Sequence, residues 1–149
     1  MVIGIFGESC TGKSSLADAI AKEIEAQIYT GKDYLKLAKQ EAQAKQKFIN
    51  LLTDNEKSND CIIYVIAEKE HLELLPPNAV RILMTASLDI IKERFAKRMN
   101  GVLPAAIAMM LENKHGMFNN EKYDLHIENG GPATKESAKQ VINLLKNRH

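Results

Sequence analysis

The strongest constraint on the fold of this chain is the stretch GESCTGKS at residues 7–14. It follows directly on the apolar run VIGIF at residues 2–6. A fully apolar run of this length is typical of a strand in the middle of a parallel sheet. After the stretch, Leu16, Ile20 and Ile24 recur every four residues, which indicates the buried face of a helix. The sequence therefore predicts a strand, a tight loop and a helix in direct succession.

The glycines, the lysine and the serine of this stretch have the spacing of a phosphate-binding loop, Gly-x-x-x-x-Gly-Lys-Ser. Such a loop points successive backbone N–H groups at anionic oxygens, and the N-terminus of the following helix adds a partial positive charge. Lys13 is expected to reach the β- and γ-phosphates and to face solvent, and Ser14 is expected to bind Mg²⁺. The residues expected to bind the nucleotide are Gly7, Glu8, Ser9, Cys10, Thr11, Gly12, Lys13, Ser14 and Ser15.

An ordinary glycine-containing turn is the alternative interpretation of the stretch, but its position between a strand and a helix favours a site for a nucleotide triphosphate with magnesium. A dinucleotide site would need Gly-x-Gly-x-x-Gly, which Gly4 and Gly7 do not supply.

Size and composition indicate one globular domain over residues 1–149, since 45% of the residues are hydrophobic. No apolar run is long enough for a membrane span, and no secretory leader is visible. Two cysteines, Cys10 and Cys61, do not make a disulfide framework, so we expect reduced thiols and a cytoplasmic location. The net charge of +1 argues against nucleic acid as a partner.

Strand and helix patterns alternate along the chain, which predicts an α/β fold with a five-stranded parallel sheet flanked by helices. Strands are expected at residues 2–6, 27–30, 61–67, 80–86 and 124–129. Helices are expected at 13–26, from about 35 to 52 as one long helix, at 68–75, at 87–99 with Ser87 as its N-cap, at 105–116, and in the last segment from Thr134. Repeats and inter-domain linkers are not apparent in the sequence.

Four stretches in this order resemble the P-loop nucleoside-monophosphate kinases, such as adenylate kinase and the cytidylate-kinase-like proteins, with shikimate and gluconate kinases as cousins. They are GESCTGKSS (7–15), IYTGKDYLK (28–36), ERFAKRM (93–99) and YDLHIENGGPATKESAKQVINLL (123–145). The resemblance implies a P-loop NTPase three-layer sandwich, ATP and Mg²⁺ as cofactors, and phosphotransfer to a small molecule. It also implies an acceptor-side helical region at about 31–58 and a short helical lid at about 99–123.

By the same resemblance, Asp33 approaches the phosphate acceptor or the water molecules bound to magnesium. Lys36 contacts a phosphate or carboxylate of the acceptor, and Pro132 lies in the loop beside the adenine. From the residues alone, Asp33 is equally suited to cap the long helix, because aspartate after a glycine turn is favoured there.

Arg94 and Arg98 lie four residues apart, so they share one face of the expected helix. The resemblance implies that Arg94 packs over the adenine and that Arg98 contacts the phosphates during transfer. A planar guanidinium suits both tasks, because it can stack on a base and its fork matches phosphate oxygens. The alternative is a solvated helix face on which the arginines pair with Asp89 and Glu93.

Three other observations limit the interpretation. Arg81 begins a strand, whereas ligands in open α/β sheets lie beyond the carboxyl ends, so we expect a structural role. Glu68 follows the strand at 61–67, where it would either hold a magnesium-bound water or begin the next helix. The four histidines, at 71, 115, 126 and 149, show no metal-ligand spacing.

These features predict an ATP- and Mg²⁺-dependent kinase of a small molecule, most simply a nucleotide or a related metabolite, with Lys13, Arg98 and Asp33 as its catalytic residues. The segment 99–123 contains no arginine after Met99, whereas monophosphate kinases carry further arginines there. A nucleotide-binding regulatory module with little phosphotransfer is therefore the alternative. A GTPase is disfavoured, since neither N-K-x-D nor D-x-x-G occurs.

Overall fold

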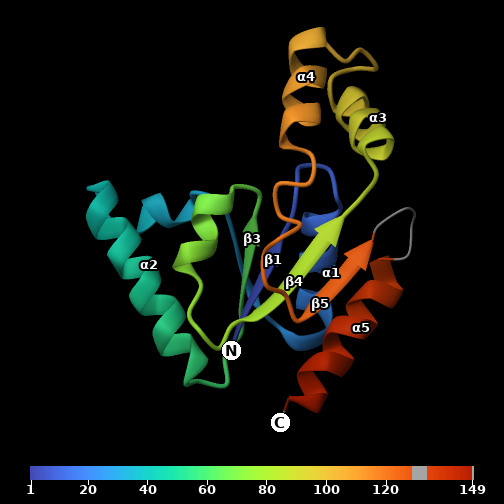
Figure 1. Cartoon of the computed structure of the whole chain (residues 1–149). Coiled ribbons are helices and arrows are strands. Elements are labelled where there is room, and N and C mark those ends of the chain that lie inside the picture. Colours follow the sequence, from blue (N-terminus) through green and yellow to red (C-terminus); the bar gives the residue numbers. More distant parts are fainter. Residues whose placement is uncertain (129–133, 149) are drawn as a thin grey trace.

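In the computed structural model, which describes residues 1–128 and 134–148, the five predicted strands form one sheet. They are β1 (Val2–Phe6), β2 (Gln27–Thr30), β3 (Ile62–Ile66), β4 (Val80–Thr85) and β5 (Leu125–Glu128). Their order across the sheet is β2-β3-β1-β4-β5, and every pair of neighbours is parallel (Figure 1). The α/β fold with a five-stranded parallel sheet is therefore confirmed.

Helices cover both faces of this sheet. They are α1 (Lys13–Ile24), α2 (Glu41–Glu56), α3 (Leu88–Arg98), α4 (Ala105–Lys114), α5 (Thr134–Asn147), and the 3₁₀ helices η1 (Asp33–Leu37) and η2 (Lys69–Leu74). One core cluster joins α1 and α5 to the sheet, and a second joins α2 and η2 to its other face. The α3–α4 pair projects beyond the carboxyl ends of the strands (Figure 1).

The central strand β1 divides its side chains between these two layers. Val2 and Phe6 belong to the core beneath α2, whereas Ile3 and Ile5 belong to the core beneath α1 and α5. This alternation follows from the two-residue period of a strand. Gly4 lies in close packing, because a Cβ atom there would lie 2.5 Å from Cδ1 of Leu75 and that side chain would have to move.

The helix expected from about 35 to 52 is wrong in one respect, because it consists of two separate segments. Ala38 has an extended backbone, with φ −157° and ψ 163°, and it separates η1 from α2. Each segment buries residues of its own: Tyr34 in η1, and Ala44, Phe48 and Leu52 in α2. Leu35 and Ala42, which the predicted helical face included, are exposed.

Other local predictions agree with the structure. Ser87 is the N-cap of α3, and its hydroxyl accepts a hydrogen bond of 3.3 Å from the backbone N–H of Ile90. Cys10 and Cys61 are both free and buried, and burial raises the pKa of the Cys61 thiol. Among the described helices, none combines the length and the apolar character needed to cross a membrane.

Phe48 links α2 to the sheet through an aromatic cluster. Its ring lies 4.9 Å from the ring of Tyr64 on β3, 5.1 Å from Tyr29 on β2, and 5.6 Å from Tyr34 on η1. The Tyr64 hydroxyl donates a 2.7 Å hydrogen bond to the backbone oxygen of Gly31, and burial raises the pKa of this phenol. The cluster therefore fixes the segment after β2 against β3.

Replacing Phe48 with alanine should lower the free energy of unfolding by about 3–5 kcal/mol, because the side chain is fully buried and its loss leaves a cavity. Urea denaturation measures this change. Lys45→Ala, at an exposed position on the same helix, is the control and should change the free energy by less than about 0.5 kcal/mol. A Phe48→Ala effect as small as that of the control would contradict the role given to the cluster.

Candidate functional site

The loop between β1 and α1 curls tightly around the start of the helix. A Cβ atom at Gly7 would lie 2.2 Å from the backbone oxygen of Met84, so only glycine fits there. Gly12 has φ 93°, in the left-handed region that glycine adopts without strain, and it caps α1. Cys10 also has a positive φ, of 65°, which is uncommon for a residue other than glycine, asparagine or aspartate.

The backbone oxygen of Glu8 accepts two hydrogen bonds inside this loop. The Thr11 hydroxyl donates to it over 2.8 Å, and the Lys13 ammonium donates to it over 2.6 Å. Lys13 is only 7% exposed, so the expectation that its side chain faces solvent is wrong. Burial, together with the nearby positive charge of Arg98, lowers the pKa of Lys13 from 10.5 to about 8. The lysine therefore lies folded against the loop with part of its hydration removed.

Both predicted arginines of α3 reach the loop. Arg94 donates a 2.9 Å hydrogen bond through Nη1 to the backbone oxygen of Cys10, so it fastens the helix to the loop. Arg98, one turn further along, lines a cavity with the loop residues. The pairing of these arginines with Asp89 or Glu93 is not seen among the described residues, where Glu93 lies 3.8 Å from Lys97 instead.

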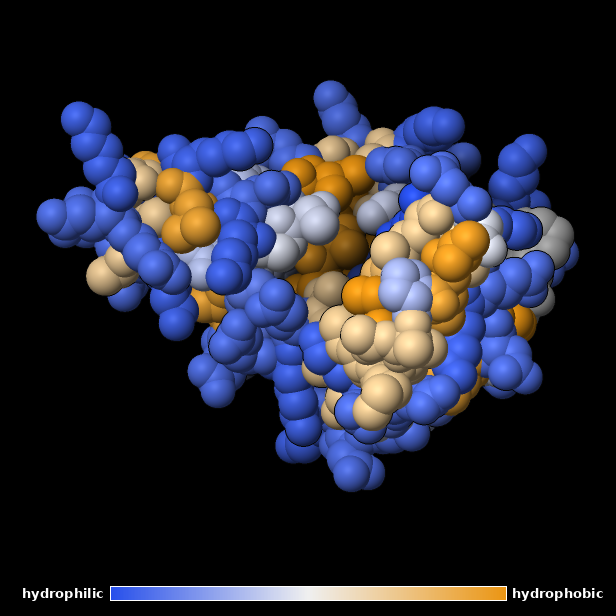
Figure 2. All heavy atoms as spheres, turned by 90° about the horizontal axis from the view of Figure 1, so that it is seen from above, coloured by the Kyte–Doolittle hydropathy of each residue, from blue (hydrophilic) through white to orange (hydrophobic). Residues whose placement is uncertain are grey.

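This cavity has a volume of about 210 Å³ and lies at the carboxyl ends of the strands, where ligands of open α/β sheets bind. Seen from above, the molecule is hollowed between the side that carries α2 and the α3–α4 pair (Figure 2). The cavity is lined by Ser9, Cys10, Gly12, Lys13, Ser14, Ser15, Thr30, Gly31, Val65, Ala67 and Arg98.

A second set of contacts connects the loop to the end of α4. The Glu8 carboxylate is almost buried, with Oε1 at 3.0 Å from His115 Nδ1 and Oε2 accepting a 3.2 Å hydrogen bond from the backbone N–H of Gly116. The sequence analysis assigned no role to His115, since more than 100 residues separate it from Glu8 and no local pattern marks the pair.

The acceptor-side residues lie outside the lined cavity. Asp33 is the first residue of η1, and its Oδ2 accepts a 2.9 Å hydrogen bond from the backbone N–H of Thr30. The alternative that Asp33 caps a long helix is therefore wrong, because that helix does not begin here. Lys36 is exposed on η1. Pro132, predicted beside the adenine, lies outside the described residues.

Arg81 lies at the opposite end of the sheet from the cavity, near the start of β4. Its backbone N–H donates to Oδ2 of Asp124 over 2.8 Å, and its backbone oxygen accepts from the N–H of Asp124 over 2.8 Å. These backbone contacts hold the approach to β5, and the distance of Arg81 from the carboxyl ends of the strands agrees with the expectation that it lies outside the site.

One cluster was missed by the sequence analysis. Glu68, directly before η2, lies with Glu70 and His71 so that one ligand atom from each residue falls within 4.8 Å of the others. The spacing E-x-E-H was present in the sequence, but it is not a familiar metal-binding pattern. His71 is buried, which the sequence does not reveal, and this burial distinguishes the cluster from an ordinary group of exposed acidic residues.

No family model matches this sequence, and no curated protein matches it at a significant level. Solved structures do match. YorR protein from Bacillus subtilis, in complex with phosphorylated GDP, is 22% identical, with 100% of this chain and 98% of that chain covered and a TM-score of 0.69. Shikimate kinase from Acinetobacter baumannii, in complex with shikimate, is 12% identical, with 99% and 93% covered and a TM-score of 0.66.

A gluconokinase from Sinorhizobium meliloti is 15% identical, with 99% of this chain and 97% of that chain covered and a TM-score of 0.61. At these identities the likeness concerns the fold. It extends over nearly the whole chain in all three cases, so the resemblance drawn from the four sequence stretches is confirmed at that level. The chain has the fold of the P-loop kinases of nucleoside monophosphates and other small molecules.

Proposed function

We propose that this protein is a P-loop phosphotransferase that moves the γ-phosphoryl group of ATP to a small molecule. The observation that carries the proposal is the cavity in which Lys13 and Arg98 meet the loop at residues 9–15. Phosphoryl transfer depends on positioning and on positive charge around the moving group. Two cations beside a glycine loop and a helix N-terminus provide that environment.

The residues of the loop fit a magnesium nucleotide. Gly7 and Gly12 allow the backbone to curl closely, and Ser14, on the first turn of α1, lines the cavity with its hydroxyl available to a metal ion. Mg²⁺ bound there would neutralise charge on the β- and γ-phosphates. We propose that Lys13 leaves the Glu8 oxygen and contacts these phosphates, while Arg94 keeps α3 on the loop and lies beside the base.

In the proposed reaction, an oxygen of the acceptor, either a phosphate oxygen or a hydroxyl oxygen, forms a bond to the γ-phosphorus as the bond from that phosphorus to the bridging oxygen of ADP breaks. ADP carries away the electron pair of the broken bond, and where the acceptor is a hydroxyl group its proton passes to the carboxylate of Asp33. Arg98 stabilises the charge on the moving group. Lys36, exposed on η1, is proposed to contact an anionic group of the acceptor, a nucleotide or a related metabolite.

The acceptor would enter on the side of residues 31–58, and residues 99–123 would serve as the lid.

A nucleotide-binding module with little phosphotransfer is a second candidate, and the small number of arginines near the cavity favours it. Arg94 is engaged with the Cys10 oxygen and the predicted lid carries no arginine, which leaves Arg98 as the arginine that lines the described cavity.

Arg98→Ala separates these two functions. If Arg98 acts mainly in the transition state, its loss should lower turnover by about 10²- to 10³-fold, while the Kd for ATP changes little. Arg98→Lys should restore part of the activity, because it keeps the charge but not the fork. The assay measures ADP formation with a panel of nucleoside monophosphates, sugar acids and cyclic hydroxy acids.

The outcomes of that assay have distinct meanings. A parallel loss of ATP affinity and turnover would make Arg98 a binding contact and not a catalytic one. Wild-type protein that binds ATP but forms no ADP with any acceptor would favour the regulatory module.

The lowered pKa of Lys13 predicts that ATP binding weakens in alkaline solution. Above pH 8 the free protein loses the lysine proton, whereas the bound phosphates favour the charged form, so binding must take up a proton. The association constant should therefore fall as the pH rises above about 8, approaching tenfold per pH unit. Calorimetry in two buffers of different ionisation enthalpy measures the proton uptake.

Lys13→Ala is the matched control for this prediction. It should bind ATP more weakly at every pH and should take up no proton above pH 8, because the titrating group has been removed. Binding by the wild type with no proton uptake in that range would show that Lys13 does not contact the phosphates.

A further inference from the structure

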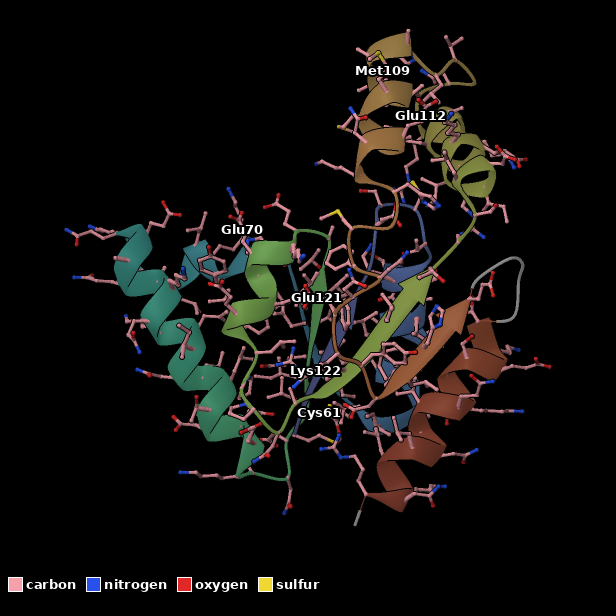
Figure 3. The ribbon with its side chains drawn as sticks, in the orientation of Figure 1. Cys61, Glu70, Met109, Glu112, Glu121 and Lys122 are labelled. Carbon is pink, nitrogen blue, oxygen red and sulfur yellow. The ribbon has the colours of Figure 1, made fainter. Side chains whose placement is uncertain are left out.

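We propose that Glu68, Glu70 and His71 bind a divalent transition metal of the zinc class, at a site separate from the nucleotide cavity. The three residues lie at the start of η2, directly after β3. Figure 3 shows Glu70 on η2 at the end of the molecule where the parallel strands finish. The cavity formed by the loop and Arg98 includes none of the three in its lining.

His71 is the observation that distinguishes this cluster from an ordinary acidic surface. It is only 5% exposed, and its ring lies 6.2 Å from the ring of Tyr34 and 6.3 Å from that of Tyr64. Within residues 1–128 and 134–148, Nδ1 is buried without a hydrogen-bond partner. Nε2 is directed at Glu68 but lies 3.9 Å from its Oε2, beyond hydrogen-bond distance.

The buried Nδ1 has lost water without a compensating hydrogen bond among the described residues, whereas Nε2 is not fully buried. Packing between two tyrosine rings nevertheless holds this ring with Nε2 aimed at the carboxylates. A metal ion between Nε2 and the carboxylates would bind the nitrogen that faces Glu68 and would leave Nδ1 without a partner in the described part of the chain. The observation that favours the ion is therefore the direction in which the buried ring points Nε2.

The separations are close to those around one bound ion. Zinc binds imidazole nitrogen and carboxylate oxygen at about 2.0–2.2 Å in tetrahedral geometry, which places two ligand atoms about 3.4 Å apart. Nε2 of His71 and Oε2 of Glu68 are 3.9 Å apart, so a small movement of one side chain would bring both to the ion. The Glu68 side chain is 54% exposed, which leaves it free to adjust to the ion.

The donor set selects the class of metal. One imidazole nitrogen and two carboxylate oxygens suit Zn²⁺ and neighbouring ions such as Mn²⁺, whereas Ca²⁺ prefers a shell of oxygens and Cu⁺ prefers sulfur. The two carboxylates balance the charge of a dication. Lys69 lies between them in sequence, but its ammonium pairs with Glu121 at 3.2 Å.

Three protein ligands leave a coordination position for water or for an oxygen of a small ligand. Nδ1 of His71 lacks the outer hydrogen-bond acceptor that usually strengthens such a ligand, so binding should be weaker than in structural zinc sites. The site needs no nucleotide, and the proposal can therefore fail or succeed independently of the proposed kinase activity.

The test is calorimetric titration of the full chain with Zn²⁺ and with Mn²⁺, in the absence of nucleotide. Glu68→Gln and Glu70→Gln should each raise the Kd for the metal by about 10- to 100-fold. Loss of an outer-shell partner lowers metal affinity by about this factor, so the loss of a direct ligand should lower it at least as much. Glu73→Gln is the matched control. Glu73 is exposed on the same 3₁₀ helix, and its replacement by glutamine removes the same charge outside the cluster. This variant should bind as the wild type does.

A second measurement identifies the histidine. Substoichiometric Mn²⁺ should broaden the imidazole NMR signals of His71, assigned with His71→Gln, before those of His115 and His126. If His71→Gln does not fold, the glutamate variants still test the proposal. Equal affinities for Glu68→Gln, Glu70→Gln and Glu73→Gln, broadening that begins at another histidine, or no binding at millimolar metal would each overturn the proposal.

Discussion

Two backbone oxygens of the loop at residues 7–12 accept hydrogen bonds from charged side chains of the helices α1 and α3. The arrangement of the site depends on these two contacts. Lys13 donates to the oxygen of Glu8, and Arg94 donates to the oxygen of Cys10. Hydrogen bonds with a charged donor are stronger than neutral ones. They fix a loop that includes a residue with positive φ at Cys10, a conformation that requires support from its surroundings.

The same loop anchors both ends of the α3–α4 pair. Arg94 fastens α3 to Cys10, and the Glu8 carboxylate holds His115 and Gly116 just after α4. Cys10 also packs in a small apolar cluster with Ile91 of α3 and Leu111 of α4. The pair therefore rests on the loop through polar and apolar contacts. Its outer surface carries apolar side chains among charged ones, with Val102 69% exposed and Met109 61% exposed. Figure 2 shows apolar atoms gathered over this part of the molecule, and Figure 3 shows Met109 on α4.

The sequence predicted the parts of the fold that depend on short-range pattern. The five strands, the phosphate-binding loop and the cap at Ser87 all follow from periodicity or from residue type at fixed spacing. It failed where tertiary burial decides. Leu35 and Ala42 matched a helical period, yet the chain buries Tyr34 and Phe48 instead and divides the expected helix at Ala38.

The candidate site shows the same division. Most of the predicted loop residues, those at 9–10 and 12–15, line one cavity together with Arg98, whereas Gly7, Glu8 and Thr11 are not among its lining residues. The Glu8–His115 contact and the burial of His71 could not be predicted, because each depends on segments brought together only by the folded chain. The expectation that Lys13 faces solvent was also wrong. The sequence is compatible both with an exposed lysine side chain and with one folded onto its own loop, and only the folded structure distinguishes them.

The charges in the cavity show what kind of ligand the site complements. Lys13 is buried, and the positive charge of Arg98 adds to the desolvation that lowers its pKa. Two cations near each other in a partly desolvated space repel, and the single carbonyl oxygen of Glu8 offsets only part of that cost. A polyanion would remove the repulsion and replace the lost hydration of Lys13. The unfavourable term in the free protein would thus become a favourable one on binding, and in the proposed function the same two cations would stabilise charge on the phosphoryl group during transfer.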